Sequence, residues 1–324
     1  MIISRTPFRI SLVGGGTDFP DYYKYNGGKV IGFAIDKYCN IFFREGNNLM
    51  DYNFRIAYSK IELSKTIENI DHPSVRNTSK YFKIINPYDI LHNGDLPAKT
   101  GLGSSSSFTV GLCNIFRTYK KKYKDPYVLA KDAIHIEQKL SKEAVGSQDQ
   151  IFAAFGGLNT IQFDQNDFYV TRHFLTEKKM RQIKENFLLM YTGITRYAET
   201  IEKTKIKKIK NNINNYDSIK ELVDIMEYEL KSGKKLNLKE IGKILNDAWN
   251  LKRKLTKKVS NSHIDKLYDD ALSYGAYGGK LLGAGGGGFY LFVVPSNKII
   301  NFKNKFKNFK FINFNVSNVG SHIV

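Results

Sequence analysis

The sequence lacks the motifs of several common nucleotide-binding folds. No G-x-x-x-x-G-K-[ST] segment occurs in its 324 residues, which excludes the Walker phosphate loop. The H-R-D and D-F-G segments of protein kinases are also absent. Residues 283–288 fit the pattern G-x-G-x-x-G, but a β-type apolar run follows them where a dinucleotide-binding fold needs a helix. A Rossmann-type dinucleotide site is therefore excluded.

Cysteines and long apolar runs are also scarce. Cys39 and Cys113 are the only cysteines, and both stand in apolar segments, which predicts buried thiols in a reducing compartment. Arg5, Arg9 and Asp18 interrupt the start of the chain, so we expect no signal peptide. No apolar stretch approaches the ~20 residues that a membrane helix needs. These absences predict a cytoplasmic protein without a membrane partner.

Acidic residues are few relative to basic ones. The chain has 31 Asp and Glu against 50 Lys and Arg, a formal net charge of +19. This charge makes an RNA-binding protein one alternative, because basic proteins gain affinity by releasing counterions from phosphates. Much of the excess lies in lysine-rich segments such as 203–210 and 298–310, which are typical of solvated helix faces. Since zinc spacings, RNP-like motifs and dense arginine patches are absent, we expect anionic small molecules and no nucleic acid as partners.

The most informative segment that is present spans residues 97–107, Pro-Ala-Lys-Thr-Gly-Leu-Gly-Ser-Ser-Ser-Ser. Gly101 and Gly103 allow a sharp turn and a close approach to a ligand, and the serines open an amphipathic run that predicts a helix. A turn of this kind directs free N–H groups and the positive end of a helix dipole to one point, which favours phosphate. A serine cap is the alternative. Two glycines and four serines exceed what a cap needs, so we favour a phosphate site.

Two carboxylates stand out further along the chain. Glu137 lies at the edge of the apolar face of a predicted helix, where Mg²⁺ or an ion-pair partner would be needed. Asp149 lies in the polar segment Gly146-Ser-Gln-Asp-Gln150 at the start of a short predicted helix. An acidic residue in a first helical turn can serve only to stabilise the helix through its interaction with the helix dipole. From the residues alone, Glu137 is more typical of an ion pair, and Asp149 fits either interpretation.

The N-terminal strand carries Arg9 and ends at Gly14-Gly-Gly-Thr-Asp18. Three glycines after a strand allow a ligand to approach the backbone closely, and Asp18 can accept hydrogen bonds from hydroxyl groups. The alternatives are a strand-ending turn with Asp18 as a helix cap, and a salt bridge for Arg9. The joint occurrence of this segment with two other glycine loops favours a binding site.

Three separate motifs follow one another along the chain. They are Pro7-x-Arg9 with residues 14–18, Pro97 with residues 101–107, and residues 283–288. This arrangement resembles the GHMP kinase superfamily over the whole chain. Within this superfamily, the chain looks most like the bacterial D-glycero-D-manno-heptose 7-phosphate kinases. The segments that carry this likeness are Gly-Gly-Gly-Thr-Asp, residues 146–150 and Tyr191-Thr-Gly-Ile-Thr-Arg196. The resemblance implies an ATP-dependent kinase that phosphorylates the anomeric hydroxyl of that sugar phosphate. A fucokinase-like or galactokinase-like enzyme is the alternative, although Gly15 and Gly16 differ from the bulkier galactokinase residues.

The resemblance also implies cofactors and roles. ATP and Mg²⁺ would be the cofactors, Asp149 and Arg9 the catalytic residues, and Ser105 or a neighbouring serine would hold the metal with Glu137. The implied ATP phosphate site comprises Gly101, Leu102, Gly103, Ser104, Ser105, Ser106 and Ser107. The implied sugar site comprises Asp18, Gly15, Gly16, Thr17, Gly157, Arg196, Gly285 and Gly286. Arg196 is the first candidate for the phosphate of the sugar, ahead of Arg172 and Lys80.

The expected fold is α+β with two domains, 1–175 and 176–324. The resemblance implies a first half like domain 2 of ribosomal protein S5 and a ferredoxin-like second half, with the site between them. The oligomeric state stays open, with a homodimer as one option. Strands are predicted at 2–13, 29–44, 54–59, 88–92, 158–163, 168–173 and 187–191, and helices at 19–25, 75–85, 104–122, 126–142 and 148–155.

Overall fold

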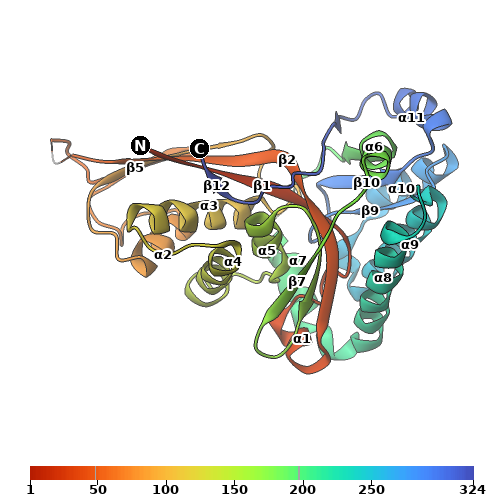
Figure 1. Ribbon diagram of the computed structural model, residues 1–324, viewed down its shortest axis with the longest axis horizontal. Coiled ribbons are helices and arrows are strands. Elements are labelled where there is room, and N and C mark those ends of the chain that lie inside the picture. Colours follow the sequence, from red (N-terminus) through yellow and green to blue (C-terminus); the bar gives the residue numbers. More distant parts are fainter. Residues whose placement is uncertain (48, 196–197) are drawn as a thin grey trace.

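The computed structural model describes residues 1–324 except Asn48, Arg196 and Tyr197. Two β-sheets form, each accompanied by helices, and they lie side by side along the long axis of the molecule (Figure 1). The first and last residues of the chain meet on the larger sheet (Figure 1). None of the helices described combines the length and apolarity that crossing a bilayer requires.

The larger sheet is built around two long curved strands. β1 (Ile2–Val13) and β2 (Gly28–Glu45) pair antiparallel along their length. One half of β2 pairs with β5 (Tyr88–Gly94) and the other half with β6 (Leu158–Phe163). The sheet is completed by β3 (Phe54–Ala57), β4 (Ile61–Ser64), β7 (Phe168–His173) and β12 (His322–Ile323). β1 is buried from residue 6 to residue 13, so a charged side chain there needs a partner.

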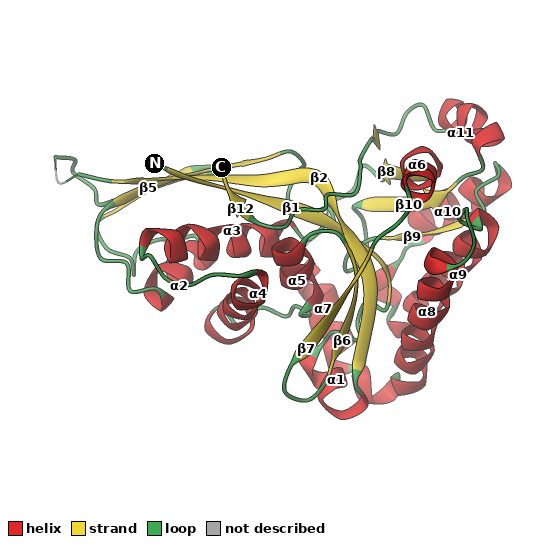
Figure 2. Ribbon diagram, in the orientation of Figure 1, coloured by secondary structure: helices red, strands yellow, loops and turns green. Residues whose placement is uncertain are grey.

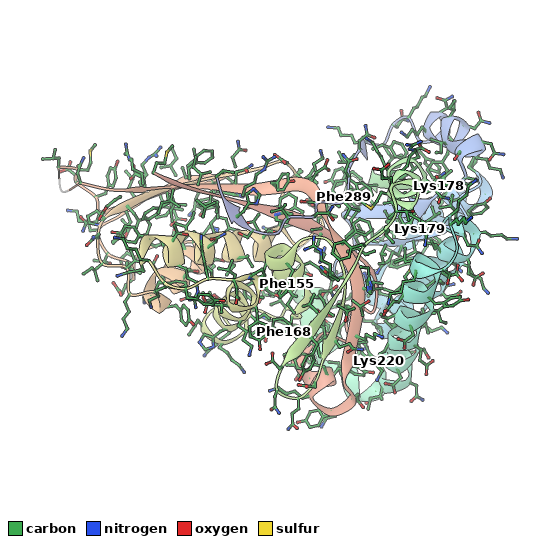
Figure 3. All side chains as sticks on the ribbon, in the orientation of Figure 1. Phe155, Phe168, Lys178, Lys179, Lys220 and Phe289 are labelled. Atoms are coloured by element: carbon green, nitrogen blue, oxygen red, sulfur yellow. The ribbon has the colours of Figure 1, made fainter. Side chains whose placement is uncertain are left out.

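Four helices cover one face of this sheet (Figure 2). They are α2 (Pro73–Tyr81), α3 (Ser104–Tyr119), α4 (Pro126–His135) and α5 (Gln148–Phe155). α3 is central, contacts β1 and β2, and is buried continuously over residues 106–116. At the edge, Phe155 of α5 packs edge-on against Phe168 of β7 (Figure 3). α1 (Pro20–Asn26) follows β1 and begins with proline, which suits a first helical turn.

The smaller sheet has the strand order β11-β8-β10-β9. Its strands are β8 (Phe187–Tyr191), β9 (Gly278–Leu281), β10 (Phe289–Val293) and β11 (Phe311–Ile312). The helices of the second half of the chain are α6 (Glu177–Asn186), α7 (Ala198–Lys207), α8 (Ile213–Lys231), α9 (Leu238–Leu255), α10 (Ser262–Ser273) and α11 (Ile299–Lys305). Short 3₁₀ turns occur at Ile209–Asn211, Lys257–Val259 and Ser296–Lys298.

The two halves share an interface that brings β1 and β9 together. α8 packs against β1 and β2, and Val223 of α8 lies so close to Gly14 that a Cβ on that glycine would be 2.8 Å from Val223 Cγ2. Lys220 (Figure 3) donates a hydrogen bond of 2.8 Å from Nζ to the carbonyl of Asn26. The end of β1, with the glycines that follow it, is therefore enclosed by both halves.

The structure departs from the expected elements in three places, of which the first is β4, a strand that the sequence pattern did not predict. The helix expected over 126–142 is α4 followed by a π-helical turn at Ile136–Leu140, and such wide turns are frequent at functional sites. The boundary expected near residue 175 falls between β7 and α6. The last residues do not stay in the second half, because β12 pairs with β1. The two residues of β12 form too short a pattern for the sequence to predict that the chain returns to the larger sheet.

Candidate functional site

Arg9 and Asp149 form the centre of the candidate site. β1 supplies Arg9 and the first turn of α5 supplies Asp149. Arg9 Nε lies 2.8 Å from Asp149 Oδ1, and Arg9 Nη2 lies 2.7 Å from Asp149 Oδ2. Such a bidentate arrangement fixes both groups more firmly than a single contact would. The Asp149 side chain is 25% exposed, against 6% for Arg9, so the carboxylate can still be reached by a substrate.

The serine loop, residues 101–107, is tied to the same strand. Arg9 Nη1 donates to the carbonyl of Gly101 at 2.6 Å, and the amide of Arg9 donates to Leu102 at 3.0 Å. Ser107 Oγ donates to the carbonyl of Pro7 at 2.9 Å. Gly103 precedes α3 without a side-chain cap. The first amides of this 16-residue helix therefore keep no intrahelical partner and can bind an anion.

Glu137 lies in the π-helical turn, fully buried against the start of α3. Its Oε2 accepts from Ser106 Oγ at 2.9 Å and from Gln150 Nε2. Its Oε1 is buried and has no hydrogen-bond partner among the described residues. Burial raises the pKa of Glu137, and the carboxylate of Glu143 raises it further. A buried carboxylate with one free oxygen suits a bound cation.

The serines of the loop differ in exposure. Ser106 and Ser107 are buried, while Ser105 is exposed and Ser104 is intermediate. The structure thus places Ser106, and not Ser105, against Glu137. Sequence analysis could not choose among four adjacent serines, because the choice depends on which helical position faces the π-helical turn.

Asp18 lies near Asp149, which follows Gln148, and Asp18 is almost fully buried. Its carboxylate accepts from the amide of Gly16 at 2.8 Å and from the amide of Gln148 at 3.1 Å. Burial raises the pKa of Asp18, the Gly16 amide opposes this shift, and the nearby Asp149 carboxylate adds to it. A Cβ on Gly146 would lie 1.9 Å from Asp18 Oδ2, so only glycine permits this approach.

The residues around Asp18 have different surroundings. Gly15 faces Ser11 and Gln148, whose Oγ and Oε1 atoms are buried without partners among the described residues. Gly16 lies against the ring of Tyr216, because a Cβ on Gly16 would be 2.7 Å from Tyr216 Cε1. Thr17 is buried and its hydroxyl donates to backbone carbonyls, including Gly14 at 2.8 Å. We therefore assign Thr17 to the shape of the loop, since its hydroxyl is already committed.

The third glycine loop, residues 283–288, abuts the serine loop. Gly283 and Gly101 touch so closely that a Cβ on Gly283 would lie 2.4 Å from Gly101 Cα. The amide of Gly286 donates to Val259 at 2.7 Å, and Gly285 packs against the same residue. Gly285 and Gly286 thus lie toward Val259, while Gly283 meets the phosphate-binding segment.

Several predicted residues lie elsewhere. Gly157 stands at the far end of α5, where a Cβ would be 2.7 Å from Arg172 Nη2, and its amide donates to Ser317. Arg172 donates to the carbonyl of Asn318. Lys80 forms a surface pair of 3.7 Å with Glu68. No described contact joins these residues to Asp149. The predicted role of Arg196 lies outside the described residues.

Sequence analysis missed three buried lysines at the interface between the halves, Lys205, Lys252 and Lys280. In a chain with this many lysines, each one resembles part of a solvated helix face. Only the contacts between the two halves reveal them, such as the hydrogen bond from Lys280 to the carbonyl of Leu12 on β1. Gln150 was missed for a similar reason, because nothing in its segment indicates that it reaches Glu137.

The contact between the glycine loops gives a stability prediction. Gly101 has φ +85°, and a Cβ there would lie 2.7 Å from the carbonyl oxygen of Leu282. Gly193 has φ +78° with nothing within 4 Å, so it is a matched control for backbone strain alone. We expect Gly193→Ala to lower the free energy of unfolding by about 1–2 kcal/mol. Gly101→Ala should lower it further and raise the KM for the nucleotide. Equal losses in urea unfolding would contradict the close contact.

Comparisons with known proteins agree with this geometry. Residues 63–157 match the model of the GHMP kinases N terminal domain, and residues 226–312 match GHMP kinases C terminal. The chain is 30% identical over 314 residues to a D-glycero-alpha-D-manno-heptose 7-phosphate kinase of Campylobacter jejuni, covering 93% of this chain and 91% of the relative. It is 26% identical to a galactokinase of Pyrococcus furiosus, covering 92% and 90%.

A solved structure shares the fold. The crystal structure of a D-glycero-D-manno-heptose 1-phosphate kinase from Bacteroides thetaiotaomicron superposes with a TM-score of 0.80, at 24% identity, covering 100% of this chain and 99% of that one. The fold and these matches define a phosphotransferase. The chain belongs to the GHMP kinase family. The expected two-domain α+β fold is thereby confirmed.

Proposed function

We propose that this kinase transfers the γ-phosphate of ATP to the anomeric hydroxyl of D-glycero-D-manno-heptose 7-phosphate, in the cytoplasm. The observation that carries the proposal is the Arg9–Asp149 pair, held between the serine loop and Asp18. The start of α3, to which Arg9 is tied through Gly101, offers free amides for nucleotide phosphates, and Asp18 offers a buried acceptor for sugar hydroxyls. The 30% identical relative named for this heptose phosphate supports the choice of acceptor.

Phosphoryl transfer depends mainly on positioning and on neutralising charge. The amides at the start of α3 would hold the nucleotide phosphates, and Asp18 would orient the sugar through its hydroxyls. Asp149 would accept the proton of the attacking hydroxyl as transfer proceeds. Arg9 holds Asp149 in place through two hydrogen bonds and anchors the carbonyl of Gly101 at the same time. One arginine thereby couples the position of the base to that of the phosphate loop.

The residues at the start of α3 fit a magnesium ion. Glu137 offers a buried oxygen without a partner, and Ser106 supplies a hydroxyl beside it. We therefore assign Glu137 with Ser106 to the metal, and Ser105, which is exposed, to the solvent side of the loop. When bound, Mg²⁺ would neutralise charge on the β- and γ-phosphates. Because carboxylates here would repel a nucleic acid backbone, nothing in the site favours the RNA-binding alternative.

A coupled assay of ADP release across hexoses, heptoses and their phosphates tests the acceptor. We expect D-glycero-D-manno-heptose 7-phosphate to give the highest kcat/KM, well above galactose and fucose. A higher value for either hexose would assign the enzyme to the galactokinase-like or fucokinase-like alternative.

Glu137→Gln tests the metal assignment. The substitution keeps the size of the side chain but removes a buried ionisable group whose pKa burial raises, so we expect the metal-free protein to unfold at an equal or higher temperature. The Mg²⁺ concentration for half-maximal activity should rise by roughly 10–100-fold, as for other lost metal contacts. Ser105→Ala is the matched control and should change neither value. An unchanged Mg²⁺ dependence in Glu137→Gln would remove this residue from the metal site.

A further inference from the structure

Three buried lysines from the second half of the chain lie within electrostatic range of one another near β1. Lys205 lies on α7, Lys252 on α9 and Lys280 on β9, and each is less than 10% exposed. Lys205 Nζ lies 5.6 Å from the ring centroid of Phe19, the residue after Asp18. A buried ammonium group costs several kcal/mol unless other groups compensate its charge. The surroundings of these lysines therefore indicate what they bind.

Lys280 has little compensation from the protein. Its Nζ donates one hydrogen bond of 2.8 Å, to the carbonyl of Leu12 at the end of β1. Burial lowers the pKa of Lys280 to about 7, with Arg9 and Lys205 adding to the shift and Asp18 opposing it. An ammonium group has three N–H donors. Two of them have no partner among the described residues.

Lys179 (Figure 3) shows what a structural buried lysine looks like in the same chain. Its Nζ donates to the carbonyls of Leu230, Lys231 and Ser232 at 2.8, 3.0 and 2.9 Å. All three donors are used at the C-terminal end of α8, where the helix dipole favours a cation. Lys280 has no such set of acceptors, so a structural role does not account for it.

The carboxylates near the lysine cluster are already engaged. Asp149 is paired with Arg9 and Glu202 with Lys205, while Asp18 accepts two amides. Lys252 Nζ donates to the carbonyls of Leu281 and Gly283 at 2.9 and 2.5 Å, which holds the third glycine loop but supplies no negative charge. Among the described residues, neither Lys252 nor Lys280 has a carboxylate within 4 Å. An anion from outside the protein would balance this charge.

Tyr216 gives an independent indication of a ligand. Its side chain is fully buried between Gly16 and Tyr22, yet its hydroxyl has no hydrogen-bond partner among the described residues. The carboxylates of Glu202 and Asp18 both lie within electrostatic range of the same hydroxyl. Burying a hydroxyl without a partner is unfavourable, so a group supplied by the substrate would satisfy it.

We propose that Lys280 and the Tyr216 hydroxyl bind the phosphate group that the acceptor sugar already carries. Both Lys280 and Tyr216 lie within electrostatic range of Asp18, whereas the serine loop would serve the nucleotide phosphates. Lys252 then acts as a positioning residue for the third glycine loop. This assignment rests on the proposed function, and it moves the phosphate subsite away from Arg172 and Lys80.

Tyr216→Phe is the first test, because it removes one atom that has no partner in the protein. We expect unchanged or higher thermal stability and a roughly tenfold or greater rise in KM for the sugar phosphate, typical of a lost bond to a charged group. Activity on the same sugar without its phosphate should not change. Tyr88→Phe is the matched control. It removes a buried hydroxyl that is bonded to Ser79 at 2.7 Å, so it should lower stability and leave KM unchanged.

Lys280→Met is the second test, with Lys179→Met as its control. We expect Lys280→Met to lower kcat/KM about 100-fold for the phosphorylated sugar and far less for the unphosphorylated one. Lys179→Met should lower stability without changing this ratio. Folding of each variant is checked by circular dichroism, and Tyr216→Phe decides the matter if Lys280→Met does not fold.

The outcomes separate this subsite from the choice of sugar. If the wild type prefers another sugar phosphate over heptose 7-phosphate, and both variants lose that preference, the subsite stands and the proposed substrate fails. If the variants lose activity equally on phosphorylated and unphosphorylated sugars, the subsite is overturned. A rise confined to the KM for ATP would also overturn it, because the lysines would then serve the nucleotide.

Discussion

Asp149→Asn should lower kcat by roughly 10²–10⁴-fold, the usual contribution of a positioned general base. Asparagine keeps the shape of the side chain and one acceptor for Arg9, but it cannot take the proton of the sugar hydroxyl. The KM for ATP should stay close to that of the wild type, since the serine loop is unchanged. Steady-state ADP release, with nucleotide affinity measured separately by calorimetry, gives both quantities.

The chain offers a matched control for this substitution. Asp132 on α4 is buried and accepts hydrogen bonds from Arg117 and Tyr81, so it forms a similar pair away from the candidate site. Asp132→Asn should lower stability and leave turnover within a few-fold of the wild type. If Asp149→Asn behaved like Asp132→Asn, Asp149 would be a structural ion-pair partner and not the base.

Arg9→Lys should lower kcat/KM by about 10²–10³-fold although it conserves the charge. Lysine cannot donate in the fixed fork that joins both Asp149 oxygens and the Gly101 carbonyl at once. We therefore expect kcat to fall and the KM for ATP to rise, because Asp149 and the serine loop both lose their hydrogen bonds to Arg9. Kinetics of Arg9→Lys at saturating and limiting ATP separate the two effects.

A double substitution shows whether Arg9 acts through Asp149. Groups that work as a unit give effects that do not add. The variant carrying both Arg9→Lys and Asp149→Asn should therefore lose little more kcat than Asp149→Asn alone. Fully multiplicative losses in kcat would mean that the two residues act separately.

The parts of the fold and site that could be predicted from the sequence depend on local patterns. The serine loop, the glycines after β1 and the short helix at Asp149 each have a composition that reports local geometry. The first two of these segments and the glycine loop at 283–288 stand in a fixed order, which was enough to indicate the family. The match of residues 63–157 and 226–312 to the GHMP kinase domains bears out that inference.

The parts that could not be predicted depend on contacts between distant segments. Ser106 faces Glu137 because a π-helical turn sets the position of the carboxylate, and no pattern of apolar residues encodes that turn. Lys280 is buried because β9 packs against the end of β1, while its own segment, Gly-Gly-Lys-Leu, resembles a surface strand. The resemblance placed Gly157 with the sugar site, although Gly157 follows the far end of α5, the helix whose first turn carries Asp149.

Phosphorus NMR of the product made from ATP and D-glycero-D-manno-heptose 7-phosphate tests the central claim most directly. A new phosphorus signal coupled to the anomeric proton, formed by the wild type and strongly reduced with Asp149→Asn, is the expected result. ADP formation with the new phosphate at another carbon, or equal product from both proteins, would contradict the assignment of Asp149 as the base acting on the anomeric hydroxyl.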